Sequence, residues 1–230
     1  MSISNPMKLI TAEFHCHTVY SGDSSNRVDA LIRAAQKRGI DRLAITDHNT
    51  IEGALRAKAL APELVIVGEE VLTDRGELIA YYVKEEVPKG LTVRETLRRL
   101  KAQGAFISIP HPFDLWRHGW PLEELVDLLS EVDALEVFNA RCLRKACNEK
   151  AFKFAWERGM PMLGGSDAHS LVELGLVLTR LPAFNSAEEL RAAAPEAHIK
   201  GRPLSVVDHF KASAMIGLSK FIPGKKSARN

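Results

Sequence analysis

The chain has 230 residues, of which 46% are hydrophobic and 26% charged, a composition typical of one globular domain that excludes a disordered chain. Its 31 basic and 29 acidic side chains give a formal charge of +2, too balanced for the positive field that non-specific duplex binding requires. The three cysteines form no Cys-x-x-Cys pair, so the sequence indicates neither a disulfide framework nor a thiolate zinc site.

The first half of the chain predicts short apolar strands that alternate with helices. Apolar side chains recur at helical spacing in Val28–Lys37, and a second helix is expected at Glu52–Leu60. The expected strands lie at residues 9–14, 42–46, 64–67 and 78–83. A turn at residues 73–77 joins the last two, so these strands follow one another without a helix between them.

The second half continues this alternation. Thr92 and Glu95 form a capping box that opens a helix at Val93–Ala102, and Ser186 with Glu189 signals another capped helix. Further helices are expected at residues 143–158 and 206–218, and further strands at 105–109, 134–138, 162–164 and 177–179. Strands that alternate with helices are typical of an α/β fold with a parallel sheet. The pattern alone does not separate a barrel from an open sheet.

Side chains that bind metals gather at the ends of the expected strands. His15 and His17 follow the first strand, and because residues two apart on a strand share a face, both imidazoles can point at one ion. The other motifs are Thr46-Asp47-His48, Gly68-Glu69-Glu70, Ile109-Pro110-His111 and Gly165-Ser166-Asp167-Ala168-His169. Each of these alone is compatible with a turn cap or a solvated side chain. Since the strands of an α/β fold end at one edge, their coincidence predicts a shared metal site.

In this order the motifs resemble those of the polymerase and histidinol phosphatase (PHP) family of metal-dependent phosphoesterases, over about residues 13–169. The resemblance implies an α/β fold, namely a distorted seven-stranded (βα) barrel similar to a TIM barrel, with the metal site at the C-terminal ends of the strands. We expect a phosphoesterase barrel at residues 7–180, a PHP-associated helical segment at 181–223 that completes the barrel, and a basic tail at 224–230.

The resemblance also implies two or three divalent metal ions per chain, either Mn, Fe or Zn. The first ion would take His15, His17, Glu70 and Asp167, the second would share Glu70 and add His111, and the third would take Asp23, His48 and His169. Seven residues after the bridging glutamate, where the family commonly has histidine, this chain has Glu77. A carboxylate ligand there favours Mn²⁺ or Fe²⁺ over Zn²⁺, and the alternative is a weak or absent second ion.

Other residues receive roles from their positions near these motifs. Asp167, His169 and His48 are expected in catalysis, and Asp47 is expected to orient an imidazole. Arg141, Arg117 and His118 are candidates for holding the phosphate of the substrate. Trp116 and Trp120 can wall the pocket or stack on a ring, and Cys142 and Cys147 are expected to be inert.

The sequence therefore predicts a phosphoric ester hydrolase that acts on a small phosphorylated metabolite or a nucleotide through a metal-activated water. One alternative is an amidohydrolase-like C–N hydrolase, which also places His-x-His on its first strand. Another is a non-catalytic or nuclease module of nucleic-acid metabolism. The near-neutral charge disfavours the nuclease, and a purely structural role would not need the nearly complete set of metal-binding side chains. Without a run of 18 apolar residues or a signal-like start, we expect a cytoplasmic protein with no membrane partner. The substrate and the oligomeric state stay open.

Overall fold

The computed structural model describes residues 8–205, 207–208 and 211–212, and within them one sheet of nine strands. The strands are β1 Leu9–Glu13, β2 Arg42–Ile45, β3 Val65–Leu72, β4 Glu77–Tyr81, β5 Phe106–Ile109, β6 Ala134–Asn139, β7 Met162–Gly165, β8 Val177–Pro182 and β9 His198–Gly201. The α-helices are α1 Val28–Lys37, α2 Glu52–Leu60, α3 Val93–Ala102, α4 Leu122–Leu128, α5 Lys145–Glu157 and α6 Ala187–Ala193.

The sheet follows chain order over most of its width, as β7-β6-β5-β4-β3-β2-β1-β8-β9. Strands β1 to β3 are parallel to one another, and so are β5 to β7. Strand β4 is antiparallel to both of its neighbours, so the two parallel groups point the same way. Six strands therefore bring their C-terminal ends to one edge, while β8 and β9 add antiparallel pairs beyond β1.

The sheet curls into a nearly closed barrel. Just past β1 and β7, Cys16 and Ala168 form a parallel bridge, in which the backbone N of His17 donates to the carbonyl of Ala168 at 2.9 Å. Thr179 of β8 and Gly164 of β7 share two further hydrogen bonds of 3.0 and 3.1 Å. The α/β class is confirmed, but the count of seven strands is wrong because β8 and β9 extend the sheet.

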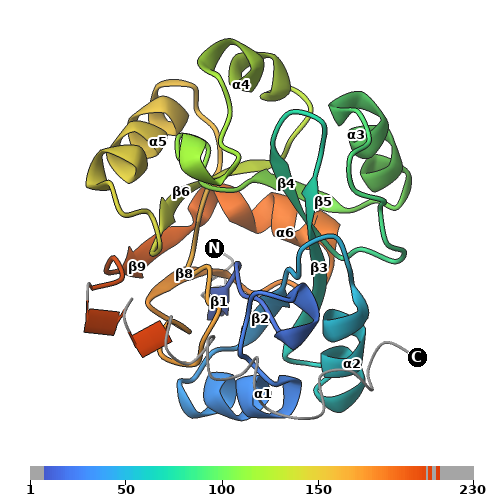
Figure 1. Cartoon of the computed structure of the whole chain (residues 1–230), viewed down its shortest axis with the longest axis vertical. Helices are drawn as coiled ribbons and strands as arrows, with labels where there is room; N and C mark the ends of the chain where they lie inside the picture. The colour runs from blue at the N-terminus through green and yellow to red at the C-terminus, as the bar shows by residue number, and fades with distance from the viewer. Residues whose placement is uncertain (1–7, 206, 209–210, 213–230) are drawn as a thin grey trace, which may run out of the picture.

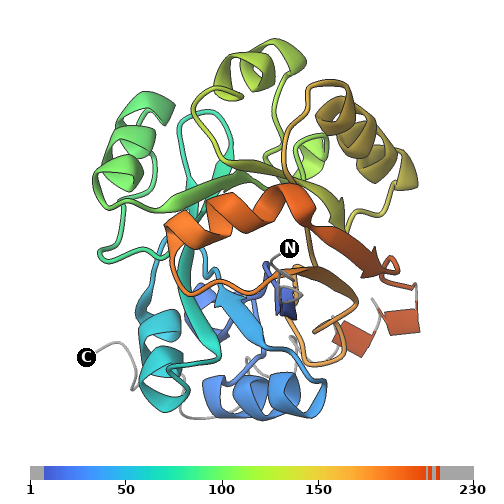
Figure 2. The ribbon, with the colours of Figure 1, turned by 180° about the vertical axis from the view of Figure 1, so that it is seen from behind.

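Helices α1 to α5 surround the barrel, as Figure 1 shows. Helix α6 takes a different position and lies across the middle of the molecule in the rear view of Figure 2. Its buried Ala187 and Leu190 belong to an apolar cluster with Phe184 of the preceding loop and with Ile10 and Phe14 of the first strand region. This packing covers the rear of the barrel, so the site described below opens at the front.

Most of the expected elements are present, and the capping signals act as predicted. Thr92 and Ser186 accept hydrogen bonds from backbone N–H groups three residues later, at 3.3 and 3.1 Å. Strand β3 is longer than expected and runs to Leu72, so Glu70 lies inside the strand rather than after it. Helix α4 and strand β9 were not anticipated. The expected helix at residues 206–218 and the tail at 224–230 lie largely outside the described residues.

No helix in the described residues combines the length and the apolar composition that crossing a bilayer requires.

Candidate metal centre

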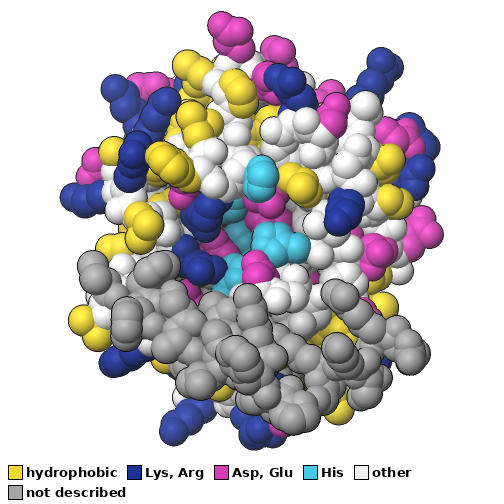
Figure 3. Space-filling view, in the orientation of Figure 1, with side chains coloured by type: hydrophobic (Ala, Val, Ile, Leu, Met, Phe, Trp, Pro, Cys, Tyr) yellow, Lys and Arg dark blue, Asp and Glu magenta, His cyan; other side chains and the backbone are white. Residues whose placement is uncertain are grey.

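Imidazole and carboxylate side chains gather in a hollow at the front of the barrel (Figure 3). The edge where the parallel strands end supplies most of them, because the chain leaves each strand there. Two come from the strands themselves and Asp23 comes from the loop after the short helix Val19–Ser21. The structure brings together all nine side chains expected at a metal site, namely His15, His17, Asp23, His48, Glu70, Glu77, His111, Asp167 and His169.

The backbone bends sharply where two of these side chains enter the hollow. Asp167 has a φ of 53° and His111 a φ of 28°, in the left-handed region that non-glycine residues rarely adopt. Such a strained backbone conformation persists only where the surrounding structure stabilises it, and it concentrates at functional sites. The bridge beside Asp167 stabilises the backbone there, since Ala168 N donates to the carbonyl of His15 at 3.2 Å.

Glu70 occupies the centre of the cluster. Its Oε2 lies 3.3 Å from His15 Nε2, 3.4 Å from His17 Nε2 and 3.2 Å from His48 Nδ1. Its Oε1 faces the other way and lies 3.3 Å from His111 Nε2. One buried carboxylate thus contacts four imidazoles, and its two oxygens could serve two different cations.

Asp167 divides its two oxygens between different partners. Oδ1 faces the cluster and lies 3.3 Å from His17 Nε2 and 3.4 Å from His169 Nδ1. Oδ2 faces away from the cluster and accepts hydrogen bonds from Arg117 and, at 3.2 Å, from Asn139 Nδ2. The outer contacts fix the orientation of the carboxylate and leave the inner oxygen for a ligand.

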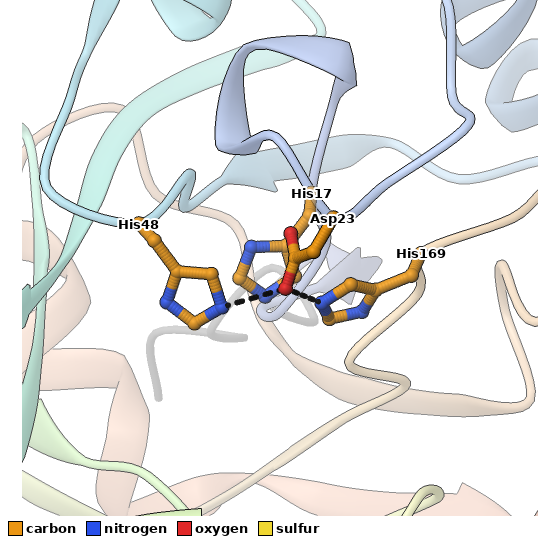
Figure 4. A group of neighbouring side chains, drawn as sticks. All are labelled: His17, Asp23, His48 and His169. Atoms are coloured by element: carbon orange, nitrogen blue, oxygen red, sulfur yellow. Dashed lines mark hydrogen bonds and ion pairs between the residues drawn. The ribbon is translucent and has the colours of Figure 1, made fainter. Parts of the chain in front are cut away.

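Besides the groups around Glu70 and Asp167, three histidine rings lie around Asp23 (Figure 4). Oδ2 of Asp23 lies 3.1 Å from His169 Nε2 and 3.3 Å from His48 Nε2. The ring of His17 lies behind them, with its centre 4.1 Å from that of His169 and 4.5 Å from that of His48. One ligand atom from each of the four residues lies within 4.8 Å of the others, so a single cation can contact them all.

Glu77 lies at the start of β4 and is buried within the same cluster. Its Oε2 is 3.7 Å from His111 Nε2 and its Oε1 is 3.9 Å from His48 Nδ1. His48 therefore turns Nδ1 to Glu70 and Glu77 and Nε2 to Asp23. The imidazole of His48 thus lies between two groups of carboxylates, whereas the sequence assigned it only to the group around Asp23.

The family comparison agrees with this geometry. Residues 13–101 match the model of the PHP domain, and residues 146–197 match the PHP-associated model. An uncharacterized protein of Methanocaldococcus jannaschii is 37% identical over 147 residues, which is 56% of this chain and 81% of that protein. The chain belongs to the PHP domain family. It is accordingly a hydrolase that acts on phosphoester bonds, as the sequence predicts.

Other similar proteins extend the comparison. Phosphoribosyl 1,2-cyclic phosphate 1,2-diphosphodiesterase of Eggerthella lenta is 33% identical over 144 residues, 58% of this chain and 50% of that protein. The structure of PsfC from Pseudomonas syringae matches 96% of this chain and all of that chain, with a TM-score of 0.64 and 17% identity. The lesion-specific endonuclease PfuEndoQ from Pyrococcus furiosus matches with a TM-score of 0.61 and 18% identity, over 84% of this chain and 58% of that one. The two structural likenesses support the fold.

Glu136 is part of this PHP site although the sequence interpretation missed it. The residue lies on β6, and its Oε1 is 2.9 Å from His15 Nδ1. Its Oε2 accepts from the backbone N of His111 at 2.8 Å and from Asn139 Nδ2 at 2.9 Å. The signal was present in the sequence, because a charged residue within the apolar strand Ala134–Asn139 must find a buried partner.

Asp47 does not have the role that the sequence assigned to it. Its carboxylate accepts from Thr18 N at 2.5 Å and from Thr18 Oγ1 at 2.6 Å, rather than from an imidazole. Asp47 therefore fixes the loop that follows His17, and Glu136 is the carboxylate that orients a histidine ring. A glutamate on a distant strand takes this place because its side chain reaches His15 from β6, past the strand β7 that bridges to the end of β1.

The three residues expected to bind phosphate differ in whether their side chains already have acidic partners. The guanidinium of Arg117 bonds to Asp167 and, at 3.0 Å, to Asp114, so it supports the cluster directly. Arg141 Nε lies 3.3 Å from Glu173 Oε1, and His118 is exposed. All three nevertheless line a cavity of about 720 Å³ that also contains ligand atoms of the cluster. Their contact with a substrate stays a prediction.

The ionisation of the imidazoles depends on which charges surround them. Burial lowers the pKa of His17 to about 3, and the charges of His169 and His48 act in the same direction. Burial also acts to lower the pKa of His15, but the carboxylates of Asp167 and Glu70 raise it well above its ordinary value. The neutral His17 can therefore offer Nε2 to a cation. The carboxylates around His15 stabilise a positive charge at that position.

The carboxylates show the same competition. Burial together with the charge of Glu70 raises the pKa of Glu77 to about 8. For Asp167, burial opposes ionisation, yet the charges of His15 and Arg117 hold the pKa well below its usual range. Nearby positive charge thus decides whether the acids of the cluster ionise. A divalent cation supplies more positive charge than a proton does.

Proposed function

We propose that this PHP protein binds two or three divalent cations, of Mn, Fe or Zn, and hydrolyses the phosphate ester of a small metabolite or nucleotide. The observation that carries the proposal is the convergence of nine imidazole and carboxylate side chains, from distant parts of the chain, in one cluster, of which seven line the cavity. The division into a barrel at residues 7–180 and a C-terminal segment at 181–223 belongs to the same proposal, as does the cytoplasmic location.

The side chains present fit a metal centre, because several of their atoms lack hydrogen-bond partners. His17 Nε2, Glu70 Oε1 and Asp167 Oδ1 are buried and form no hydrogen bond. Most buried polar atoms in folded proteins are paired, since an unpaired one costs about 1–3 kcal/mol. Nitrogen and oxygen atoms that converge without forming hydrogen bonds have free lone pairs, and such lone pairs are what divalent cations bind.

Three groups of residues would hold the ions. The first is His15, His17 and Asp167, and the third is His17, Asp23, His48 and His169. The second combines His48, Glu70 and Glu77, with His111 facing both glutamates. The groups share His17 and His48, so we propose that the three positions are adjacent and that Glu70 lies between the first and the second. Asp167, His169 and His48 are the residues we assign to catalysis, as ligands beside the reacting phosphate.

When bound, the cations would neutralise the charge of a phosphate ester and lower the pKa of a water molecule. The protein prepares for this by orienting its ligands before substrate arrives. Glu136 holds the ring of His15, and Arg117 with Asn139 holds Asp167. Asp23 is the most accessible of the carboxylates, with 51% of its side chain exposed, so the phosphate meets the cluster at this end of the cavity.

A nuclease remains the second candidate, and one feature of the cavity favours it. Arg117, Arg141 and Arg144 all line the cavity that contains the cluster, and several guanidinium groups around one cavity suit a substrate with more than one phosphate. The names of two similar proteins, a phosphodiesterase and an endonuclease, are compatible with this candidate. The amidohydrolase alternative has no such support beyond the fold.

Metal analysis combined with a substrate panel tests the proposal. Purified protein should contain Mn, Fe or Zn and should hydrolyse p-nitrophenyl phosphate or a phosphorylated metabolite, but not amides or lactones. Asp167→Asn should remove the activity, because it removes a charged ligand atom and the partner of Arg117. Asp127→Asn, which alters an exposed residue of α4, is the matched control and should leave activity unchanged. Full activity in Asp167→Asn would refute the assignment.

A further inference from the structure

We propose that Trp116 and Arg144 form a subsite for a nucleobase, so that the phosphate ester hydrolysed at this site is a nucleotide rather than a simple sugar phosphate. The inference rests on the proposed phosphoester hydrolysis and adds the class of substrate. Its observations are the exposure of Trp116, the backbone hydrogen bonds of the turn that carries it, and the cavity that both residues share with the metal cluster.

The two tryptophans of the loop after β5 have opposite environments. Trp120 is 1% exposed, and its Nε1 donates to the carbonyl of Glu77 at 3.1 Å. Trp116 is 82% exposed, although a tryptophan is among the side chains that gain most from burial. Trp116 lines the cavity that contains Glu70 and Asp167. A large aromatic surface is thus presented to solvent at the entrance to the site.

The loop holds Trp116 in this position. Backbone N–H groups of Arg117 and Gly119 both donate to the carbonyl of Asp114, at 2.9 and 3.0 Å. His118 has a φ of 56°, and a side chain at Gly119 would lie 2.8 Å from the carbonyl oxygen of Asp114. These contacts define the turn from which Trp116 extends to the cavity. A preformed aromatic surface binds a ring with little loss of conformational entropy.

Arg144, at the start of α5, completes the subsite. The carbon at the centre of its guanidinium lies 5.7 Å from the ring centre of Trp116, within the range of a cation–π contact. Both side chains line the same cavity as the exposed apolar Leu143. Aromatic rings and guanidinium planes are the two surfaces on which proteins stack nucleobases.

The size and charge of the cavity agree with a nucleotide. A volume of about 720 Å³ lies in the range of sites that hold a whole organic ligand, whereas a phosphate group alone occupies only a fraction of it. Acidic and imidazole side chains line one part, and Arg141 and Arg144 line another. Lysine and arginine side chains border the hollow in Figure 3. The phosphate would lie at the cluster and the base at Trp116.

Adenosine monophosphate and ribose 5-phosphate provide the decisive comparison, since they share the phosphate and the ribose and differ by the base. The wild-type protein should have the higher kcat/KM for the nucleotide. Trp116→Ala should lower that value about 5- to 150-fold, mainly through KM, which is the range of stacking losses on alanine substitution. The same variant should leave the kcat/KM of ribose 5-phosphate unchanged, and Trp116→Phe should restore part of the preference.

Trp156→Ala is the matched control, because Trp156 is 69% exposed but lies on α5 outside the cavity. This variant should hydrolyse both compounds as the wild type does. Equal kcat/KM values for the two compounds in the wild type would overturn the base subsite. A Trp116→Ala variant that loses activity equally on both compounds would also overturn it.

A binding measurement keeps this inference distinct from the proposed function. Calorimetric titration of the Mn²⁺-loaded protein should show tighter binding of adenosine than of ribose, neither of which carries an ester to hydrolyse, and Trp116→Ala should remove the difference. Absence of hydrolysis of every phosphate ester, with this binding preference present, would refute the hydrolase and support the base subsite. Hydrolysis of phosphate esters without any binding preference would refute the base subsite alone.

Discussion

Replacing Glu136 with glutamine tests whether this residue prepares His15 to bind a cation. Glu136 accepts three hydrogen bonds, from His15 Nδ1 at 2.9 Å, from the backbone N of His111 at 2.8 Å and from Asn139 Nδ2 at 2.9 Å. The last two reach the same oxygen. A glutamine of the same shape has one acceptor oxygen and one donor group, so it can satisfy only one side of this arrangement.

The glutamine should direct its oxygen to the two donors and its NH₂ group to His15. His15 must then present an unprotonated Nδ1 and carry its proton on Nε2, the nitrogen that lies 3.3 Å from Glu70 Oε2. That proton occupies the lone pair which a cation needs. A hydrogen bond to a charged group contributes about 1.5–3 kcal/mol, so the affinity for the ion at His15 should fall about 10- to 150-fold.

Calorimetric titration of metal-free Glu136→Gln with Mn²⁺ measures this loss, and nitrogen-detected NMR reports which ring nitrogen of His15 carries the proton. Glu149→Gln is the control, because it removes an exposed glutamate whose partner is Lys145, away from the cluster. Urea unfolding of both variants shows whether the fold persists. A Glu136→Gln protein that is stable and binds Mn²⁺ within threefold of the wild type would refute the reasoning.

Three further changes probe the same centre. Gly165→Ala would place a methyl group against His15 and 2.5 Å from Glu136 Oε1. The variant should lose about 1–3 kcal/mol of unfolding free energy and bind Mn²⁺ more weakly. A variant whose unfolding and titration curves match those of the wild type would contradict this packing. Chelation of bound ions should lower the midpoint of thermal unfolding. An ion at 100 times its dissociation constant stabilises the folded state by about 2.7 kcal/mol, or roughly 5–11 °C for a chain of this size. An unchanged midpoint in scanning calorimetry would mean that the folded state holds no ion. Glu77→His should shift preference from Mn²⁺ toward Zn²⁺ in a competition titration, and an unchanged ratio would place Glu77 outside the ligands.

Most of the cluster of imidazoles and carboxylates was predictable, because it depends on local patterns and one general rule, whereas Asp23 and Glu77 were expected there only from the family resemblance. Short apolar runs mark the strands, and the motifs after them, such as the pair His15 and His17, follow within two or four residues. The rule that parallel strands end at one edge then brings these motifs together without knowledge of the pairing. Glu70 fitted the rule only in part, because it lies within β3 and reaches the hollow along the strand.

The rest of the sheet depends on pairing that no local pattern contains. Strand β8 joins β1 through antiparallel pairs such as Ile10 with Leu181, and β9 joins β8. The sequence of β9, His198–Gly201, is mostly exposed and lacks an apolar run, so nothing in it indicates a strand. Its conformation follows from the edge that β8 offers. Contacts between distant segments decided the pairing of β8 and the existence of β9, as tertiary context often does.

Two glutamates show how contacts between distant segments also fix the position of His15. Glu13, at the end of β1, accepts from the backbone N of His15 at 3.2 Å and from the backbone N of Ser166 at 2.9 Å, so it joins the ends of β1 and β7. Glu136 accepts from the ring of the same histidine. One carboxylate thus positions the backbone and the other the imidazole. Each is a buried acid in an apolar strand, and a buried acid is tolerated only where donors surround it. A lone glutamate in such a strand is therefore a sequence signal for a donor cluster, and in this chain two such signals converge on one histidine.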